Sequence, residues 1–206
     1  MQTIPEILAE ELGQRQDHVE NVITLLDEGN TVPFIARYRK EMHGAMDDQT
    51  IRNLADRLAY LRNLEARRQE VKNSIENQGK MTEELSKAID EAKTLAEVED
   101  LYRPYKQKRR TRATIAREKG LAPLAELLYA QEPDCPAPEE AAKAYVDPEK
   151  GVNSAEEALA GASDIIAETI SDDAEVRKAL RELYLEWADV VSVAAKKDPE
   201  DTVYRN

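Results

Sequence analysis

Cysteine, histidine, glycine and aromatic residues are all scarce in this chain of 206 residues. It contains one Cys, two His, seven Gly, one Phe and one Trp. The single cysteine, Cys135, cannot form an internal disulfide, which fits a reducing compartment. No apolar run approaches the ~18 residues that a transmembrane helix needs, and the N-terminus lacks the basic start and apolar stretch of a signal peptide. We therefore expect a cytoplasmic protein without membrane contact.

Catalytic and metal-binding patterns are also missing. His18 and His43 are preceded, three residues upstream, by Arg15 and Lys40 rather than by Glu, which disfavours a di-iron carboxylate bundle. There is no His-Glu-x-x-His pair, no phosphate-binding glycine loop and no dinucleotide fingerprint. Acidic pairs such as the one at 47–48 stand at expected helix starts, where capping accounts for them. The sequence predicts no enzyme activity, no cofactor and no metal site.

Strong helix formers dominate what the chain does contain, and Ala, Leu, Glu, Lys and Arg lead the composition. Apolar residues recur at threes and fours over 48–78, which predicts one long central helix ended by Gly79. Shorter helices over 4–12 and 16–28, separated by Gly13, predict an N-terminal hairpin that resembles a helix-turn-helix. Because no alternating strand pattern competes, the predicted fold class is all-α, a multi-helix orthogonal array.

Proline spacing suggests how the chain divides. Three prolines in residues 132–138 predict a linker between an N-terminal helical region, 1–131, and a C-terminal helical segment, 139–206. An apolar stripe over 173–195 predicts a last helix, with Trp187 in the core. The final residues carry no visible terminator, which suggests a cut inside a longer protein.

A basic run is the strongest exception to the acidic character of the chain. Between residues 103 and 119 lie eight basic side chains and one acidic one, a net +7 in a chain of net charge −13. In one interpretation the arginines grip phosphates while Tyr102 and Tyr105 stack on bases. In the other, the run pairs with acids of the same protein and the tyrosines are packing anchors. The candidate nucleic-acid-binding residues of the run are Lys106, Lys108, Arg109, Arg110, Arg112 and Arg117.

A second, smaller group of cations lies in residues 32–40. Here Phe34, the only Phe, is expected to pack under Tyr38. The cations either extend a basic surface or pair with local acids. They complete the candidate set and are Arg37, Arg39 and Lys40.

The N-terminal hairpin is a weak candidate for reading DNA. A recognition helix needs basic and amide side chains that face the groove. The segment 16–28 instead carries Asp17, Glu20, Asp27 and Glu28. A structural hairpin is therefore favoured over a helix that enters the major groove.

Two long motifs and one capped helix resemble a known family. Residues 31–41 (TVPFIARYRKE), residues 99–121 (EDLYRPYKQKRRTRATIAREKGL) and the helix that begins at Ser154 are similar to the bacterial Tex transcription-accessory family, and the resemblance spans nearly the whole chain. It implies an N-terminal portion of a larger protein that continues into an inactive RNase H-like domain, helix-hairpin-helix units and an OB-fold, the main RNA-binding element. The family is similar to a eukaryotic transcription elongation factor and histone chaperone.

Two functional hypotheses follow from the sequence. In the first, the chain is a helical module of a transcription-associated protein that makes weak contacts with RNA or DNA and meets the transcription machinery and the remaining domains of the full-length protein. In the second, it is a structural or protein-docking module without nucleic-acid contact of its own. The two differ in whether the basic run faces phosphate or carboxylates of the protein.

Overall fold

The computed structural model describes residues 2–44, 46–107 and 109–193, and these ranges are all-α, which confirms the predicted fold class. Twelve α-helices and two short 3₁₀ segments make up their regular structure, with one isolated β-bridge between Asp147 and Val152. The chain forms two compact units, residues 1–105 and residues 106–206, and each is described by itself. No helix of the described ranges is both long enough and apolar enough to cross a membrane.

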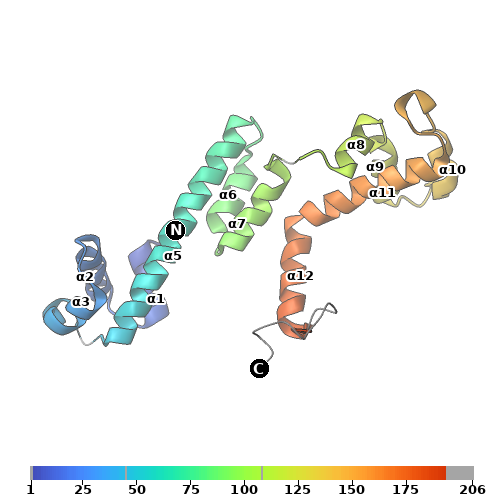
Figure 1. Cartoon of the computed structure of the whole chain (residues 1–206). Coiled ribbons are helices and arrows are strands. Elements are labelled where there is room, and N and C mark those ends of the chain that lie inside the picture. Colours follow the sequence, from blue (N-terminus) through green and yellow to red (C-terminus); the bar gives the residue numbers. More distant parts are fainter. Residues whose placement is uncertain (1, 45, 108, 194–206) are drawn as a thin grey trace, which may run out of the picture. The chain divides into compact units, whose positions relative to one another are not determined.

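The first unit is built along one long helix, as Figure 1 shows. Its described residues form α1 (Ile4–Leu12), α2 (Gln16–Asp27), α3 (Val32–Tyr38), α4 (Lys40–His43), α5 (Asp48–Asn77), α6 (Glu83–Glu91), α7 (Leu95–Tyr102) and the 3₁₀ segment η1 (Arg103–Tyr105). The predicted long helix over 48–78 matches α5 to within one residue. Its start is fixed by Asp47, whose carboxylate accepts a hydrogen bond from the Thr50 amide at 2.7 Å.

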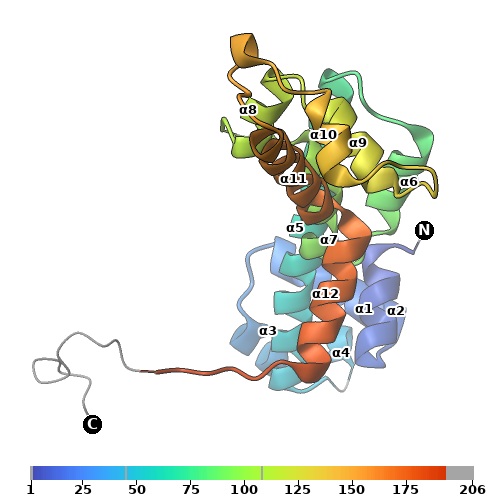
Figure 2. The same ribbon diagram turned by 90° about the vertical axis from the view of Figure 1, so that its right-hand side faces the viewer.

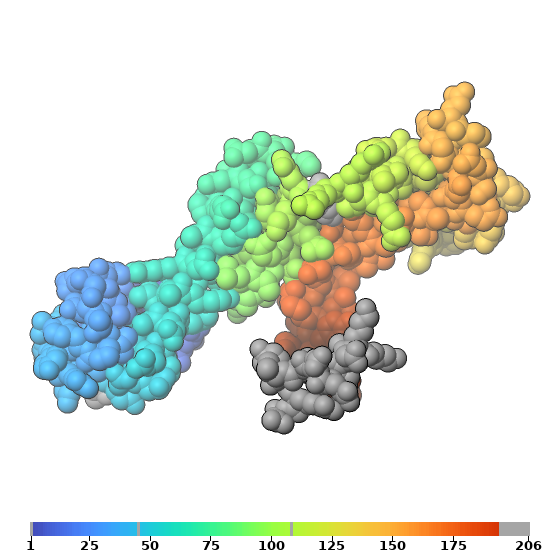
Figure 3. Space-filling view, viewed as in Figure 1, coloured from blue at the N-terminus to red at the C-terminus, as the bar shows by residue number. Residues whose placement is uncertain are grey.

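Each half of α5 carries its own hydrophobic cluster. The N-terminal half packs with α1, α2 and α3 around the buried side chains of Leu8, Val19, Val22, Leu25, Ile35, Ile51 and Leu54. The C-terminal half packs with α6 and α7 around Leu64, Val71, Ile75, Ile89 and Val98. In the space-filling view of Figure 3 the blue N-terminal residues and the green residues of the first unit gather separately, with cyan residues between them. One helix therefore organises both cores of the first unit.

Ion pairs join α5 to the N-terminal helices. The Arg57 guanidinium donates to the Glu11 carboxylate of α1 at 2.7 Å, and Arg62 donates to Asp27 of α2 at 2.7 Å. Each hydrogen-bonded guanidinium stabilises the charged form of its partner, so the pKa values of Glu11 and Asp27 lie below their ordinary values. The acidic side chains of α2 are thus partly used in packing the first unit.

The second unit packs around α11. Its described helices are α8 (Arg112–Glu118), α9 (Ala122–Ala130), α10 (Pro138–Lys143), η2 (Pro148–Lys150), α11 (Ala155–Asp172) and α12 (Ala174–Trp187). Figure 2 shows α8, α9 and α10 gathered along α11. Small buried side chains such as Ala116, Ala158 and Ala162 let these helices approach closely. At Gly161 a Cβ atom would lie 2.4 Å from the Leu121 Cδ1 atom, so the lack of a side chain there permits the close approach of α11 to Leu121.

The proline-rich segment 132–138, expected as an interdomain linker, joins α9 to α10 inside the second unit. Both helices contact each other, and both contact α11. The Cys135 thiol lies 3.9 Å from the Leu127 carbonyl oxygen of α9. The division between compact units lies instead between Tyr105 and Lys106, near the start of the basic run.

The last helix differs from its prediction. It ends at Trp187 rather than near residue 195, and Trp187 is 74% exposed instead of lying in the core. The expected stripe of Val176, Leu180 and Leu183 is present, but α12 has no buried residue. Among the described elements only α11, which precedes it, makes more than weak contact with α12. The periodicity identified the apolar face correctly, whereas burial depends on a covering element.

Candidate nucleic-acid interface

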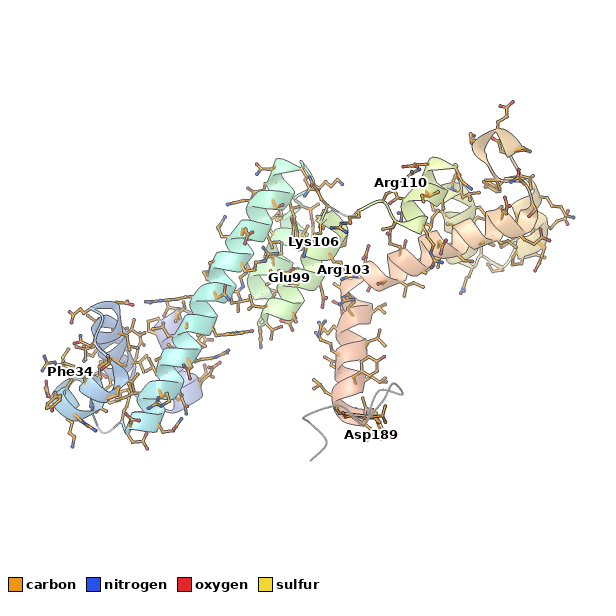
Figure 4. The ribbon with its side chains drawn as sticks, viewed as in Figure 1. Phe34, Glu99, Arg103, Lys106, Arg110 and Asp189 are labelled. Atoms are coloured by element: carbon orange, nitrogen blue, oxygen red, sulfur yellow. The ribbon has the colours of Figure 1, made fainter. Side chains whose placement is uncertain are left out.

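The basic run divides into structurally different parts. Arg103 belongs to η1 in the first unit, whereas Lys106 and the residues after it belong to the second. The helix α8 begins after Thr111, whose Oγ1 accepts a hydrogen bond from the Thr114 amide at 3.0 Å. Arg110 therefore precedes the helix, as Figure 4 shows. The candidate Lys108 lies outside the described residues.

Two of the candidate arginines pair with α11. Arg117 donates to the Glu168 carboxylate at 2.5 Å, and Arg112 lies 3.4 Å from Asp164. The Glu168 side chain is only 16% exposed and also accepts a hydrogen bond from the Thr111 hydroxyl at 2.9 Å. These contacts hold α8 against α11. For Arg117 in particular, they favour the interpretation in which the run binds carboxylates of its own chain.

The remaining candidates of the run lie on the surface. Arg110 pairs with Glu118 at 2.6 Å, and both side chains are more than half exposed, so their interaction is weak. Lys106 and Arg109 are exposed. Arg109 forms no ion pair with any described residue. One part of the run thus forms ion pairs within the second unit, whereas the other part is exposed at the surface.

The two tyrosines that flank the start of the run are packing anchors. The Tyr102 hydroxyl lies 2.9 Å from the Ser74 hydroxyl of α5, and the Arg67 guanidinium lies 5.5 Å from the centre of the Tyr102 ring. Tyr105 packs on the same cluster, and its carbonyl accepts a hydrogen bond from Gln78 at 3.0 Å. Base stacking on these rings, one of the two alternatives from sequence, is therefore not supported.

The second cation group surrounds a pair of aromatic rings at the α3–α4 junction. The ring centres of Phe34 and Tyr38 lie 5.3 Å apart, as expected from the sequence, and Tyr38 is 62% exposed. The Arg39 guanidinium lies 5.1 Å from the centre of the Phe34 ring. Arg37 and Lys40 are exposed. Figure 4 shows Phe34 on α3, near the N-terminal end of α5.

The helix α2, the weak candidate for reading DNA, is committed to packing and carries acids on its open side. Asp17 pairs with Arg15 at 2.7 Å, and Glu20 accepts a hydrogen bond from Gln16 at 2.8 Å. Val19 on the opposite face is fully buried. This arrangement supports the structural hairpin and gives no support to reading of the major groove by α2.

A groove that the sequence did not reveal lies between α8, the turn before α11 and α11 itself. It has a volume of about 460 Å³, and its lining includes both Arg112 and Lys119 as well as Glu157 and Asp164. The Lys119 ammonium donates to the Gly151 carbonyl at 2.7 Å across one end. Because both cations and carboxylates line it, the groove does not select for an anion. Its acids come from residues 45 to 52 positions further along the chain than Arg112, so no local pattern indicated them.

No group of three or more His, Cys, Asp or Glu side chains within the described ranges is placed to hold a metal ion. The described structure is thus a helical module with two surface sets of cations, one on each unit.

Comparison of the sequence with known families identifies the class of protein. Residues 2–76 match the family described as the Tex-like protein N-terminal domain, and residues 134–205 match the Tex central region-like family.

The chain belongs to the Tex family, as the resemblance predicted. It is 48% identical over 201 residues to Protein YhgF of Escherichia coli (strain K12), covering 97% of this chain and 26% of that protein. It is 46% identical over 187 residues to Transcriptional accessory protein Tex of Neisseria gonorrhoeae, covering 91% and 24%. It is 33% identical over 165 residues to the human S1 RNA-binding domain-containing protein 1, covering 79% and 16%. The chain spans about a quarter or less of the length of these relatives.

Proposed function

We propose that this chain is a non-enzymatic helical module of a transcription accessory protein that associates with nucleic acid. The names of its relatives in Neisseria gonorrhoeae and in humans support this role, because one is a transcriptional accessory protein and the other contains an S1 RNA-binding domain. Its partners would be RNA or DNA, the transcription machinery and the further domains that the longer relatives contain. We also propose a cytoplasmic location, which its single thiol, Cys135, fits.

One observation carries the proposal of a direct contact with nucleic acid. The chain has a net charge of −13, yet Arg37, Lys40 and Arg109 are exposed and form no ion pair with a described residue. In a protein with such an excess of carboxylates, unpaired cations on the surface are available for phosphate. The contact is expected to be weak, since few such cations are present.

Fluorescence anisotropy with labelled 12-nucleotide RNA and DNA at increasing salt tests the contact. If about three phosphates are neutralised on a single strand, log affinity falls with log salt at a slope of about −2. Arg109→Gln is expected to lower the affinity, while Arg117→Gln changes it less because Arg117 already binds Glu168. No detectable binding by the wild-type chain at 50 mM salt contradicts the proposed contact.

The second candidate function is a docking or scaffolding module without nucleic-acid contact. The Arg117–Glu168 and Arg112–Asp164 pairs favour it, because in both a basic side chain of the run lies against a carboxylate of α11. In this case Arg109→Gln leaves nucleic-acid binding by the full-length protein unchanged and weakens the association of this region with another protein domain. The two functions therefore differ in the behaviour of one exposed arginine.

A further inference from the structure

Apart from Arg103, the arginines of the first unit fall into two groups. Six of them bind carboxylates at distances of 2.6–2.9 Å, and these are Arg15, Arg52, Arg57, Arg62, Arg67 and Arg68. Arg37 and Arg39 form no ion pair with any described residue, and the same is true of Lys40. These three cations are neighbours in the sequence and in the structure. Among the described residues, the acidic first unit thus leaves this local cation group without carboxylate partners.

The local backbone explains why these cations gather at one corner. Ile35 is fully buried and anchors α3, so Phe34, Arg37 and Tyr38 share the outer face of the helix at spacings of three and four. At Arg39 the backbone leaves the helical region, with φ −127° and ψ 33°, and α4 begins at Lys40. We call the group Phe34, Arg37, Tyr38, Arg39 and Lys40 the α3–α4 corner.

The charge balance of the corner is locally positive. Within residues 31–46 there are three Arg or Lys residues and one acid, Glu41, a net charge of +2. The acids that follow are already engaged: Asp47 caps α5, and Asp48 pairs with Arg52 at 2.9 Å. An incoming phosphate therefore meets two exposed cations without having to displace a carboxylate.

The aromatic side chains indicate which class of ligand fits the α3–α4 corner. The Tyr38 ring is 62% exposed, and it rests against Phe34, which the Arg39 guanidinium covers at 5.1 Å. An exposed aromatic ring supported from below, with cations beside it, is the arrangement by which proteins stack unpaired bases and hold the adjoining phosphates. A duplex keeps its base faces stacked inside, so it uses the cations but not the ring.

We propose that the α3–α4 corner binds single-stranded nucleic acid, with one base stacked on Tyr38 and the flanking phosphates on Arg37 and Lys40. Arg39 positions the Phe34 ring beneath Tyr38. The assignment rests on the proposed function and identifies where in the first unit the contact is made. An acidic peptide could also pair with these cations, but it offers no planar base to stack on the Tyr38 ring. The experiment below distinguishes this alternative from a nucleic acid.

The experiment measures anisotropy of labelled oligo(dT) and oligo(U) 12-mers with the whole 206-residue chain. Tyr38→Ala is expected to lower affinity about 5- to 150-fold, the range for the loss of one base stack, while Tyr38→Phe keeps it. Arg37→Gln with Lys40→Gln reduces affinity and makes the salt slope shallower by about 1.4, or −0.7 per phosphate. Lys80→Gln is the charge control, because Lys80 is exposed and lies just past the far end of α5, and it leaves affinity unchanged.

Circular dichroism melting of each variant confirms that the fold is retained, which the exposure of Tyr38 and Arg37 favours. Photo-cross-linking of a 5-iodouracil 12-mer, followed by mass spectrometry, is expected to label Tyr38. A wild-type chain that binds the single strand while Tyr38→Ala binds equally well overturns the corner site and leaves the proposed function standing. A chain that binds no nucleic acid contradicts the proposed function itself. Equal displacement of the probe by a poly-glutamate peptide and by unlabelled oligo(U) favours an acidic protein partner and overturns the stacking site.

Discussion

The Arg117 guanidinium of α8 donates to the Glu168 carboxylate of α11 at 2.5 Å, across a packed interface between two helices that lie about fifty residues apart in the chain. Glu168 is mostly shielded from water and also accepts a hydrogen bond from Thr111 at the start of α8. The two contacts fix both ends of a seven-residue helix that is too short to be stable alone. The part of the basic run with the best-defined contacts therefore stabilises the packing of α8 on α11.

Loss of these contacts is expected to destabilise the second unit. Glu168→Ala removes the acceptor of both Arg117 and Thr111, and we expect a loss of about 1–2 kcal/mol in the free energy of unfolding. Urea denaturation followed by circular dichroism measures it. Glu118→Ala, which removes only the exposed partner of Arg110, serves as the control and is expected to cost less than about 0.5 kcal/mol. Equal effects of the two substitutions contradict the structural role of Glu168.

Gly161→Ala tests the close packing of α11. The added Cβ would lie 2.4 Å from Leu121 Cδ1 and 3.3 Å from Ala116 Cβ, and Leu121 is almost fully buried and cannot move freely. Overpacking outweighs the gain in helix propensity, so we expect a net loss of about 1–2 kcal/mol. Ser163→Ala on the exposed side of the same helix changes stability by less than about 0.5 kcal/mol. Thermal melting of both variants measures the difference, and a more stable Gly161→Ala variant contradicts the packing.

His43 of α4 is expected to be replaceable by an apolar residue. It is 1% exposed, and neither ring nitrogen has a hydrogen-bond partner among the described residues. His43→Leu keeps a similar volume and removes two buried polar atoms, so stability is expected to stay equal or to rise by up to about 1 kcal/mol. His43→Asn, which keeps buried polar atoms, is the matched comparison and is expected to be less stable than His43→Leu. Chemical denaturation in urea measures both, and a large loss on His43→Leu refutes the expectation.

The first unit is expected to lose stability in acid. The pKa values of Glu11 and Asp27 lie below their ordinary values of 4.5 and 3.8, because Arg57 and Arg62 hydrogen-bond the charged carboxylates. A carboxyl whose pKa is lowered on folding adds stability above its unfolded pKa and loses it as pH falls through the folded one. Urea unfolding between pH 7 and pH 3 should show this fall.

The double variant Arg57→Gln with Arg62→Gln provides the comparison. It removes both donors, so the decline in stability between pH 5 and pH 3 becomes shallower, and the difference from the wild type is largest at neutral pH. Arg52→Gln, whose partner Asp48 lies on the same helix, is the charge-matched control. Parallel pH curves for the wild type and the double variant count against the assignment.

The apolar face of α12 is expected to drive self-association of the isolated chain. Leu180, Leu183 and Trp187 are all at least 46% exposed along one helix, and contiguous apolar surface of this kind associates in water. Leu180→Gln with Leu183→Gln lowers the association measured by sedimentation velocity at increasing concentration. Lys178→Gln on the same helix is the control and leaves the sedimentation coefficient unchanged. A wild-type chain that stays monomeric at high concentration excludes the expectation.

The local structure was largely predictable because its signals are local. The side chains of Thr3 and Thr94 form capping boxes with Glu6 and Glu97, and the apolar spacing of α5 located a 30-residue helix. At Ser154 the hydroxyl accepts a hydrogen bond from the Glu157 amide, and the Glu157 carboxylate accepts one from the Asn153 amide. Neighbouring residues set these features, so a single sequence contains enough information to place them.

The features that were not predictable depend on contacts between distant residues. The partners of Arg112 and Arg117 lie more than fifty residues further along the chain, and many other acids were equally plausible from the sequence. Likewise, the stripe around Trp187 shows which face is apolar but not whether another element covers it. The candidate residues Arg37, Arg39 and Lys40 were found from sequence, whereas coordinates were needed to show that they pair with no carboxylate in the described part of the chain.

The length of α5 has a geometric consequence. Its 30 residues rise by about 45 Å at 1.5 Å each, and a separate hydrophobic cluster packs against each half. The α3–α4 corner packs at its beginning, while Gln78, just past its end, bonds the last residue of the first unit, Tyr105. The helix thus acts as a spacer of set length. A nucleic-acid strand bound at the α3–α4 corner is kept at a fixed distance from Tyr105, where the first unit ends.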